Sequence, residues 1–234
     1  METITARGVT GSSGNHVLLK DVARIASDDM AARVLIIDSD SAVRQSLEGL
    51  VKSAGWSAES FTSAEAFLSH PRSAAPCCVI LDLRLPGLSG LQLQQQLAGR
   101  PDIPLIFLSR DTDVVMAVQA MKAGAVEFFI KPFNDAALLH VIGAAIDRSR
   151  AALRHHAEVQ VLRDCYMTLT PREREVMRLV VSGLLNKQVG GELGIHEVTV
   201  KAHRGQVMRK MKADSLPDLV TMAMRLGLRH ASKH

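Results

Sequence analysis

The chain has 234 residues, of which 47% are hydrophobic and 3% aromatic, and its formal net charge is +4. This length is sufficient for two ordinary domains with hydrophobic cores. No apolar run approaches the roughly 20 residues of a membrane span, residues 1–32 lack the apolar segment of a secretion signal, and the three cysteines have neither disulfide-framework nor zinc-site spacing. The sequence therefore predicts a cytoplasmic two-domain protein that does not bind membranes.

The positive charge is concentrated in the last third of the chain. Residues 151–234 contain 14 lysines and arginines against 8 aspartates and glutamates, whereas residues 1–150 contain 14 against 16. A basic surface binds a polyanion such as DNA because it releases the counterions of the phosphates. We therefore expect double-stranded DNA as a partner of the C-terminal part.

Residues 1–32 are expected to form a flexible N-terminal extension, since glycine and serine gather near residues 11–14. From residue 33 to 148, strand and helix patterns alternate. Short β-rich runs lie at 31–38, 56–61, 77–83, 103–109 and 126–131, and amphipathic stretches lie at 41–54, 63–69, 90–98, 112–123 and 134–148. This alternation predicts an α/β domain with a five-stranded, doubly wound parallel sheet.

Polar residues follow four of the predicted strands. Asp38, Ser39 and Asp40 follow the first, and the others are Asp82, Ser109 and Lys131. Ligands of such sheets bind beyond the carboxyl ends of the strands, so these side chains are expected to meet at one edge. Carboxylates beside an ammonium group are what a Mg²⁺-assisted phosphoryl acceptor needs, with one aspartate as the attacking group.

Residues 33–148 resemble the receiver domain of two-component systems. The resemblance rests on Leu-Asp-Leu-Arg-Leu-Pro-Gly-Leu-Ser-Gly at 81–90, Met-Lys-Ala-Gly-Ala at 121–125 and Phe-Ile-Lys-Pro-Phe at 129–133. It implies that Asp82 is the phosphoacceptor, Lys131 the cation that contacts the phosphoryl group, Ser109 the switching hydroxyl, and Phe128 the aromatic side chain that follows it. It also implies a cis peptide bond between Lys131 and Pro132.

One position departs from the receiver pattern. Receivers usually end the first strand with two successive acids, the second of which ligates magnesium, but here the pair is Asp38-Ser39. The expected metal ligands are therefore Asp38 and Asp82 only. A neutral serine hydroxyl is a poorer ligand for a hard dication, so Mg²⁺ is expected to bind weakly unless Asp40 or a water molecule takes that position.

Residues 149–167 are predicted to form a helical linker, because residues 147–166 contain neither glycine nor proline. Its apolar residues would pack on the receiver or pair with a second copy. The following segment, 168–230, predicts a smaller all-α domain. One helix is expected at Asn186–Leu193, a turn with positive φ at Gly194, and a basic helix from His196 to Met211, which together indicate a helix-turn-helix.

This segment resembles the LuxR-type DNA-binding domain of NarL/FixJ-class response regulators. The matching parts are Leu-Thr-Pro-Arg-Glu-Arg-Glu at 169–175, the Gly-Leu-x-Asn-Lys stretch at 183–187 and Thr-Val-Lys-x-His-Arg at 199–204, although His196 replaces the usual capping serine or threonine. By this resemblance Lys201 and Ala202 face base edges and Lys187, His203 and Arg204 position the DNA backbone. The full set of expected DNA-binding residues is Asn186, Lys187, Thr199, Lys201, Ala202, His203 and Arg204.

The resulting hypothesis is a homodimeric transcriptional regulator, not an enzyme, whose phosphoryl donor would be a histidine kinase. Two alternatives stay open. The receiver could act as a phosphorylation-independent dimerisation or partner-binding module. The chain could instead be an aspartyl phosphohydrolase that uses Asp82, although it offers no second general acid placed for turnover.

Overall fold

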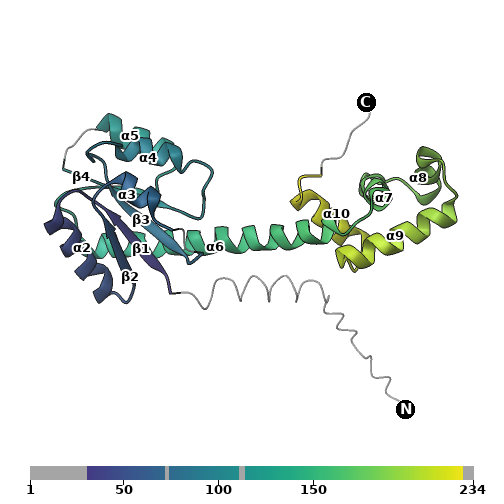
Figure 1. Ribbon diagram of the computed structural model, residues 1–234, viewed down its shortest axis with the longest axis horizontal. Helices are drawn as coiled ribbons and strands as arrows, with labels where there is room; N and C mark the ends of the chain where they lie inside the picture. Colours follow the sequence, from purple (N-terminus) through teal and green to yellow (C-terminus); the bar gives the residue numbers. More distant parts are fainter. Residues whose placement is uncertain (1–30, 72–73, 111–113, 229–234) are drawn as a thin grey trace, which may run out of the picture. The chain divides into compact units, whose positions relative to one another are not determined.

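The structure, a computed structural model, describes residues 31–71, 74–110 and 114–228 (Figure 1). The described residues form two compact units, divided between His155 and His156. Of the expected N-terminal extension at 1–32, all but the last two residues lie outside the described ranges.

The first unit is built around one parallel sheet with the strand order β2-β1-β3-β4-β5. The predicted alternation of strands and helices is confirmed. The strands are β1 (Arg33–Ile37), β2 (Ser57–Phe61), β3 (Cys77–Asp82), β4 (Leu105–Ser109) and β5 (Glu127–Ile130), and the helices are α2 (Ser41–Ser53), α3 (Ala64–Ser69), α4 (Gly90–Gln96), α5 (Val114–Lys122) and α6 (Asp135–Met167).

Successive residues of the central strands face opposite sides of the sheet, so each side has its own core. Val34 and Ile36 of β1 pack with apolar residues of α2 and α6, whereas Ile37 faces residues of α3, α4 and α5. Figure 1 shows these two layers of helices on either side of the sheet. The arrangement buries both faces and leaves the carboxyl ends of the strands open for a site.

Helix α6 is longer than the expected linker. The predicted stretch at 134–148 and the connector at 149–167 form one continuous helix, Asp135–Met167. Leu138, Ile142 and Ile146 belong to the core of the first unit, whereas Leu162 belongs to a core of the second. Among the residues that the structure describes, none of the helices combines the length and the hydropathy that a membrane span requires.

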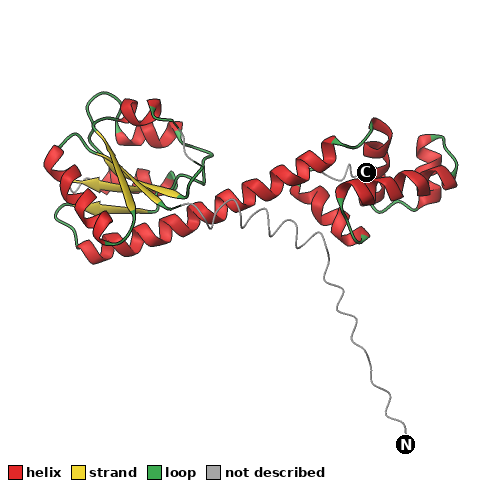
Figure 2. Ribbon diagram, turned by 60° about the horizontal axis from the view of Figure 1, so that its bottom comes forward, coloured by secondary structure: helices red, strands yellow, loops and turns green. Residues whose placement is uncertain are grey.

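The second unit is all helical, as Figure 2 shows by the absence of strands from its described part. It contains α7 (Pro171–Val181), α8 (Asn186–Leu193), α9 (Glu197–Met211) and α10 (Leu216–Arg225), together with the end of α6. Helix α7 starts at a capping box, in which the Thr170 hydroxyl accepts from the Glu173 amide and the Glu173 carboxylate accepts from the Thr170 amide.

Candidate phosphoacceptor pocket and DNA-binding surface

Strand register brings the sequence-predicted polar residues to one edge of the sheet. Ile37 pairs with Leu81 on adjacent parallel strands, so Asp38 and Asp82, which follow these partners, lie side by side. The Lys131 amide donates to the Ser109 carbonyl at 2.7 Å, and this bond places the end of β5 next to the end of β4. The four strand ends therefore form one pocket edge, as expected from the topology.

Lys131 joins the two aspartates. Its Nζ lies 2.7 Å from Asp38 Oδ2 and 3.0 Å from Asp82 Oδ2. The other carboxylate oxygens accept backbone hydrogen bonds, Asp38 Oδ1 from the Asp40 amide at 2.9 Å and Asp82 Oδ1 from the Arg84 amide at 3.0 Å. Each oxygen of the pair thus has a protein donor, which fixes both carboxylates in place.

Asp82 is partly desolvated but remains accessible from the pocket. It is 9% exposed, against 2% for Asp38. Burial raises the pKa of Asp82, and hydrogen bonds from Arg84 and Lys131 act in the opposite direction. A carboxylate that is held by an ammonium group and has lost part of its hydration shell is arranged to act as a nucleophile.

The two expected switch residues lie on neighbouring strands. Ser109 ends β4 and is 1% exposed, so its hydroxyl is enclosed at the pocket edge. Phe128 in β5 is half-buried and stacks on Phe107, with ring centroids 6.3 Å apart. The peptide bond between Lys131 and Pro132 is cis, which confirms that prediction.

The mouth of the pocket contains residues that the sequence patterns did not single out. Arg84 and Arg110 line it together with Asp38, Ser39, Asp40 and Asp82. Arg110 directly follows Ser109, the last residue of β4. This position after a strand end could have identified Arg110 from the sequence as a pocket residue. Arg44 Nη1 donates to the carbonyls of Asp38 at 2.7 Å and Ser39 at 3.0 Å, and thereby fixes the loop between β1 and α2.

Asp40 does not turn towards Asp82. Its Oδ1 accepts from the Ala42 amide at 2.9 Å as the N-cap of α2, and its Oδ2 lies 2.5 Å from the Arg110 guanidinium. The hydrogen bond from Arg110, followed by that from Ala42, lowers the pKa of Asp40. Both oxygens of this carboxylate are therefore engaged, and Asp40 does not take the place of the missing acid.

This set of donors fits a divalent cation poorly. Among the described residues there is no group of three histidine, cysteine, aspartate or glutamate side chains that could hold a metal ion. Ser39 contributes only a neutral hydroxyl where a third carboxylate would be needed, and Lys131 offsets one of the two negative charges of Asp38 and Asp82. Because Mg²⁺ prefers charged oxygen ligands, the pocket lacks the charge that would hold the ion firmly.

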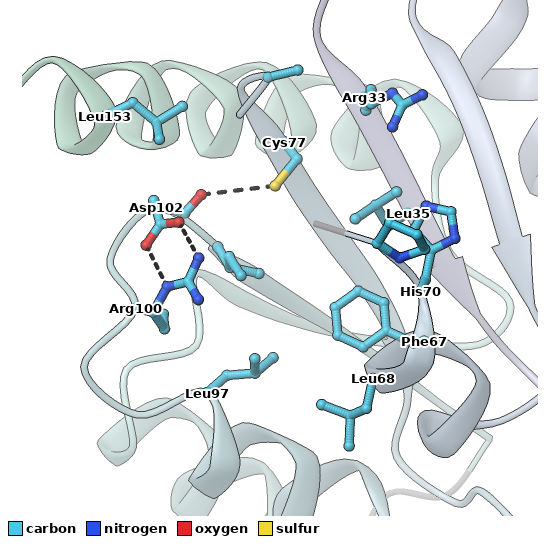
Figure 3. Close-up of a pocket in the computed structure, with 13 residues that line it drawn as sticks. Arg33, Leu35, Phe67, Leu68, His70, Cys77, Leu97, Arg100, Asp102 and Leu153 are labelled. Carbon is cyan, nitrogen blue, oxygen red and sulfur yellow. Dashed lines mark hydrogen bonds and ion pairs between the residues drawn. The ribbon is translucent and has the colours of Figure 1, made fainter. Parts of the chain in front are cut away.

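A second cavity lies at the opposite end of the sheet, near the start of β3 (Figure 3). Its lining combines apolar side chains with charged ones that are paired with neighbours. Arg100 binds Asp102 at 2.7 Å, and Glu59 lies 3.1 Å from His70 and 3.8 Å from Arg33. We therefore assign the candidate phosphoryl chemistry to the pocket around Asp82.

The second unit contains a helix-turn-helix at α8 and α9. Gly194 ends α8 with φ 65°, in the left-handed region that glycine adopts without strain, and α9 begins after His196. The turn is tight, because a Cβ atom on Gly190 would lie 2.7 Å from the Ile195 carbonyl oxygen. The predicted helix, turn and second helix are thus present at the predicted residues.

Helix α9 buries Val200, Val207 and Met211 and exposes its other face. Thr199, Lys201 and Ala202 are exposed, and Val198 beside them is 77% exposed. Arg204 Nη1 donates to Asn186 Oδ1 at 3.1 Å, which ties α9 to α8. His203 is half-buried and Lys187 of α8 is exposed. All seven expected DNA-binding residues therefore lie on these two helices, and none of them belongs to the buried core of this unit.

Comparisons with known proteins agree with this division. Residues 34–143 match the family of response regulator receiver domains, and residues 167–223 match the LuxR family of bacterial regulatory proteins. The chain is 45% identical to nodulation protein W of Bradyrhizobium diazoefficiens over 84% of this chain and 87% of that protein, and 45% identical to response regulator protein TodT of Pseudomonas putida over 85% and 88%. The solved structure of response regulator StyR has 41% identity and a TM-score of 0.72, covering 83% of this chain and 99% of that one. The chain belongs to the NarL/FixJ-class response regulators, which are transcriptional regulators that join a receiver domain to a LuxR-type DNA-binding domain.

Proposed function

We propose that a histidine kinase phosphorylates Asp82 and that this modification controls DNA binding. The observation that supports the proposal is the pocket in which Lys131 holds both Asp38 and Asp82. We assign the receiver to residues 33–148, the helical linker to 149–167 and the DNA-binding domain to 168–230. Because the proposed partners are DNA and a histidine kinase, we place the protein in the cytoplasm.

Receiver domains typically bind Mg²⁺ in their acidic pocket. In this chain we propose that Asp38 and Asp82 bind the ion weakly, since Ser39 lacks the charge of the usual acid. Ser109 and Phe128 are proposed to respond to the phosphoryl group, because Ser109 ends the strand beside Asp82 and Phe128 packs on β4.

The proposed active form is a homodimer on paired half-sites. Helix α5 exposes several apolar side chains, with Val114 70%, Val115 67% and Val118 44% exposed. Met121 on the same helix is 41% exposed and Ile130 at the end of β5 is 45% exposed. An apolar surface of this kind is stabilised when a second copy covers it, and a symmetric dimer needs only one such surface per subunit.

The phosphorylation proposal is tested with the purified full-length protein and acetyl phosphate, with and without Mg²⁺. A stable adduct of one phosphoryl group, seen by intact mass spectrometry and absent from Asp82→Asn, supports it. No adduct under any condition, including incubation with a kinase that phosphorylates a related regulator, would favour a phosphorylation-independent module. Continuous release of phosphate would favour an aspartyl phosphohydrolase.

DNA contacts are proposed at Lys201 and Ala202 for base edges and at Asn186, Lys187, Thr199, His203 and Arg204 for the backbone and its positioning. We predict that Lys201→Ala loses about 1–3 kcal/mol on the specific site and relaxes one base preference. Lys187→Ala should weaken binding to specific and random DNA alike and reduce the salt dependence by about one unit of slope.

The measurement is DNA affinity at several salt concentrations, on a site selected from a random library and on unselected DNA. Lys201 is held by Glu197 at 3.1 Å in the free protein, so Glu197→Gln is a control that releases the lysine without removing it. Equal losses on both DNAs for Lys201→Ala and Lys187→Ala would contradict the division of roles.

A further inference from the structure

We propose that Arg110 binds the phosphoryl group on Asp82 and supplies there the positive charge that receivers usually obtain from a divalent cation. The inference rests on the proposed phosphorylation of Asp82 and adds that this reaction proceeds without bound metal. Its basis is the poor metal-ligand set of the pocket together with the arginine at its mouth.

The resting partner of Arg110 is Asp40. The two side chains form an ion pair of 2.5 Å, and both line the pocket that contains Asp82. The Arg110 side chain is 64% exposed and that of Asp40 is 38% exposed, so little packing opposes an exchange of partners. Arg110 can therefore leave one carboxylate for a group with more negative charge.

The charges of the pocket favour this exchange. Asp38, Asp40 and Asp82 are balanced by three cations, namely Arg84, Arg110 and Lys131. An acid at position 39 would leave one negative charge in excess, but Ser39 removes it. Phosphorylation of Asp82 adds negative charge, and a planar guanidinium matches phosphoryl oxygens with two parallel hydrogen bonds.

The reaction can be written for acetyl phosphate. A carboxylate oxygen of Asp82 attacks phosphorus and forms a new O–P bond, while the bond from phosphorus to the acetyl oxygen breaks and acetate leaves with the electron pair. No proton, oxidant or reductant is needed. Arg110 and Lys131 would together stabilise the negative charge on the transferred group, which is the effect that a bound cation has in a phosphoryl transfer.

The test measures the rate of adduct formation with acetyl phosphate in EDTA and in Mg²⁺, by intact mass spectrometry. We expect the unaltered protein to react at comparable rates in both buffers. Arg110→Gln should lose about tenfold in EDTA and become dependent on Mg²⁺, and Arg110→Lys should recover part of the loss. Arg150→Gln removes an arginine from an exposed pair with Asp147 on α6 and is the matched control.

Two further measurements separate the proposal from simple loss of charge. Asp40→Asn keeps the N-cap of α2 but releases Arg110, so it should react in EDTA at least as fast as the unaltered protein. Calorimetric titration with Mg²⁺ should show tighter binding to Arg110→Gln, in which Asp40 Oδ2 is free. An adduct that forms only with Mg²⁺, or an Arg110→Gln rate in EDTA equal to that of Arg150→Gln, would overturn the proposal while leaving Asp82 as the acceptor. No adduct in either buffer would overturn both.

Discussion

At the residue scale, the pocket differs from the receiver pattern at one position, where Ser39 lies between Asp38 and Asp40. Asp38 is buried and bound to Lys131, and Asp40 is bound to Arg110 and to the start of α2. Neither neighbour replaces the missing carboxylate. A third acidic ligand would add both a donor oxygen and a negative charge for a hard cation.

We predict that Ser39→Asp binds Mg²⁺ more tightly than the unaltered protein and is phosphorylated faster at Asp82 when Mg²⁺ is present. Titration calorimetry measures the affinity and intact mass spectrometry the rate. Ser53→Asp adds the same charge at the exposed end of α2, away from the pocket, and should change neither. Equal Mg²⁺ affinity in the unaltered protein and Ser39→Asp would mean that another group already ligates the ion.

A second residue with a distinct role is Glu173, a buried acid in the DNA-binding unit. Its Oε2 lies 2.6 Å from Lys210 Nζ and accepts from the Thr170 amide at 2.8 Å. Burial raises the pKa of Glu173, but the hydrogen bonds from Lys210 and Thr170 lower it by more, so the net shift is downward. The charged form therefore stabilises the fold at neutral pH, and this contribution is lost as the pH falls through the folded pKa.

We predict that Glu173→Gln, which can keep the bond to the Thr170 amide, lowers the free energy of unfolding of this unit by about 1–3 kcal/mol at pH 7. The difference from the unaltered protein should shrink below about pH 4, where the glutamate becomes protonated in the unfolded chain and then in the folded one. This difference in the free energy of unfolding is measured by urea titration, with circular dichroism as the signal of unfolding. A difference that does not change with pH would exclude the ion pair as its cause.

At the element scale, the helices of the DNA-binding unit begin in different ways. The Thr170 hydroxyl caps α7 by accepting from the Glu173 amide at 3.2 Å, whereas His196 at the start of α9 makes no side-chain cap hydrogen bond. Amide groups in the first turn of α9 thus lack the side-chain acceptor that a serine would offer.

We predict that His196→Ser raises the free energy of unfolding of this unit by about 1 kcal/mol and that Thr170→Ala lowers it by a similar amount. Circular dichroism in urea follows the helices. Trp56, the single tryptophan, lies in the receiver unit, and its fluorescence should report no change. A loss of stability in His196→Ser would show that the histidine ring contributes in another way.

The sequence predicted the strands of the receiver unit and the helix-turn-helix well, because local patterns determine them. The strands alternate in hydrophobicity or are apolar throughout, and Gly194 marks the turn between α8 and α9, so their bounds were predicted to within two residues. The sequence did not predict that α6 is one continuous helix. Gly143 lies within this helix, and so does the boundary between the two units. The pair of Arg110 with Asp40 joins loops 70 residues apart, and no periodicity encodes such a contact. It depends on strand order and side-chain placement.

At the scale of the whole molecule, the net positive charge and the exposed apolar surface of α5 lie in different units. Basic residues are concentrated in the C-terminal third, whereas α5 of the receiver exposes Val114, Val115 and Val118. Each DNA-binding unit has one helix-turn-helix and would read one half-site. If two copies join through their receivers, binding of one DNA-binding unit to its half-site brings the other unit close to the second half-site. The affinity of the dimer for DNA with two half-sites would therefore rise without a new DNA contact.

We predict that Val118→Asp keeps the phosphorylated protein monomeric at micromolar concentration, because a carboxylate on the apolar α5 surface would lose its hydration in the dimer. Sedimentation velocity measures the oligomeric state. Affinity for DNA with two half-sites should fall about a hundredfold, while affinity for a single half-site should not change.

Ser53→Asp, which adds a charge elsewhere on the receiver, is the control and should dimerise normally. A Val118→Asp protein that still dimerises on phosphorylation would show that another surface joins the subunits, and loss of binding to the single half-site would indicate damage to the DNA-binding unit instead.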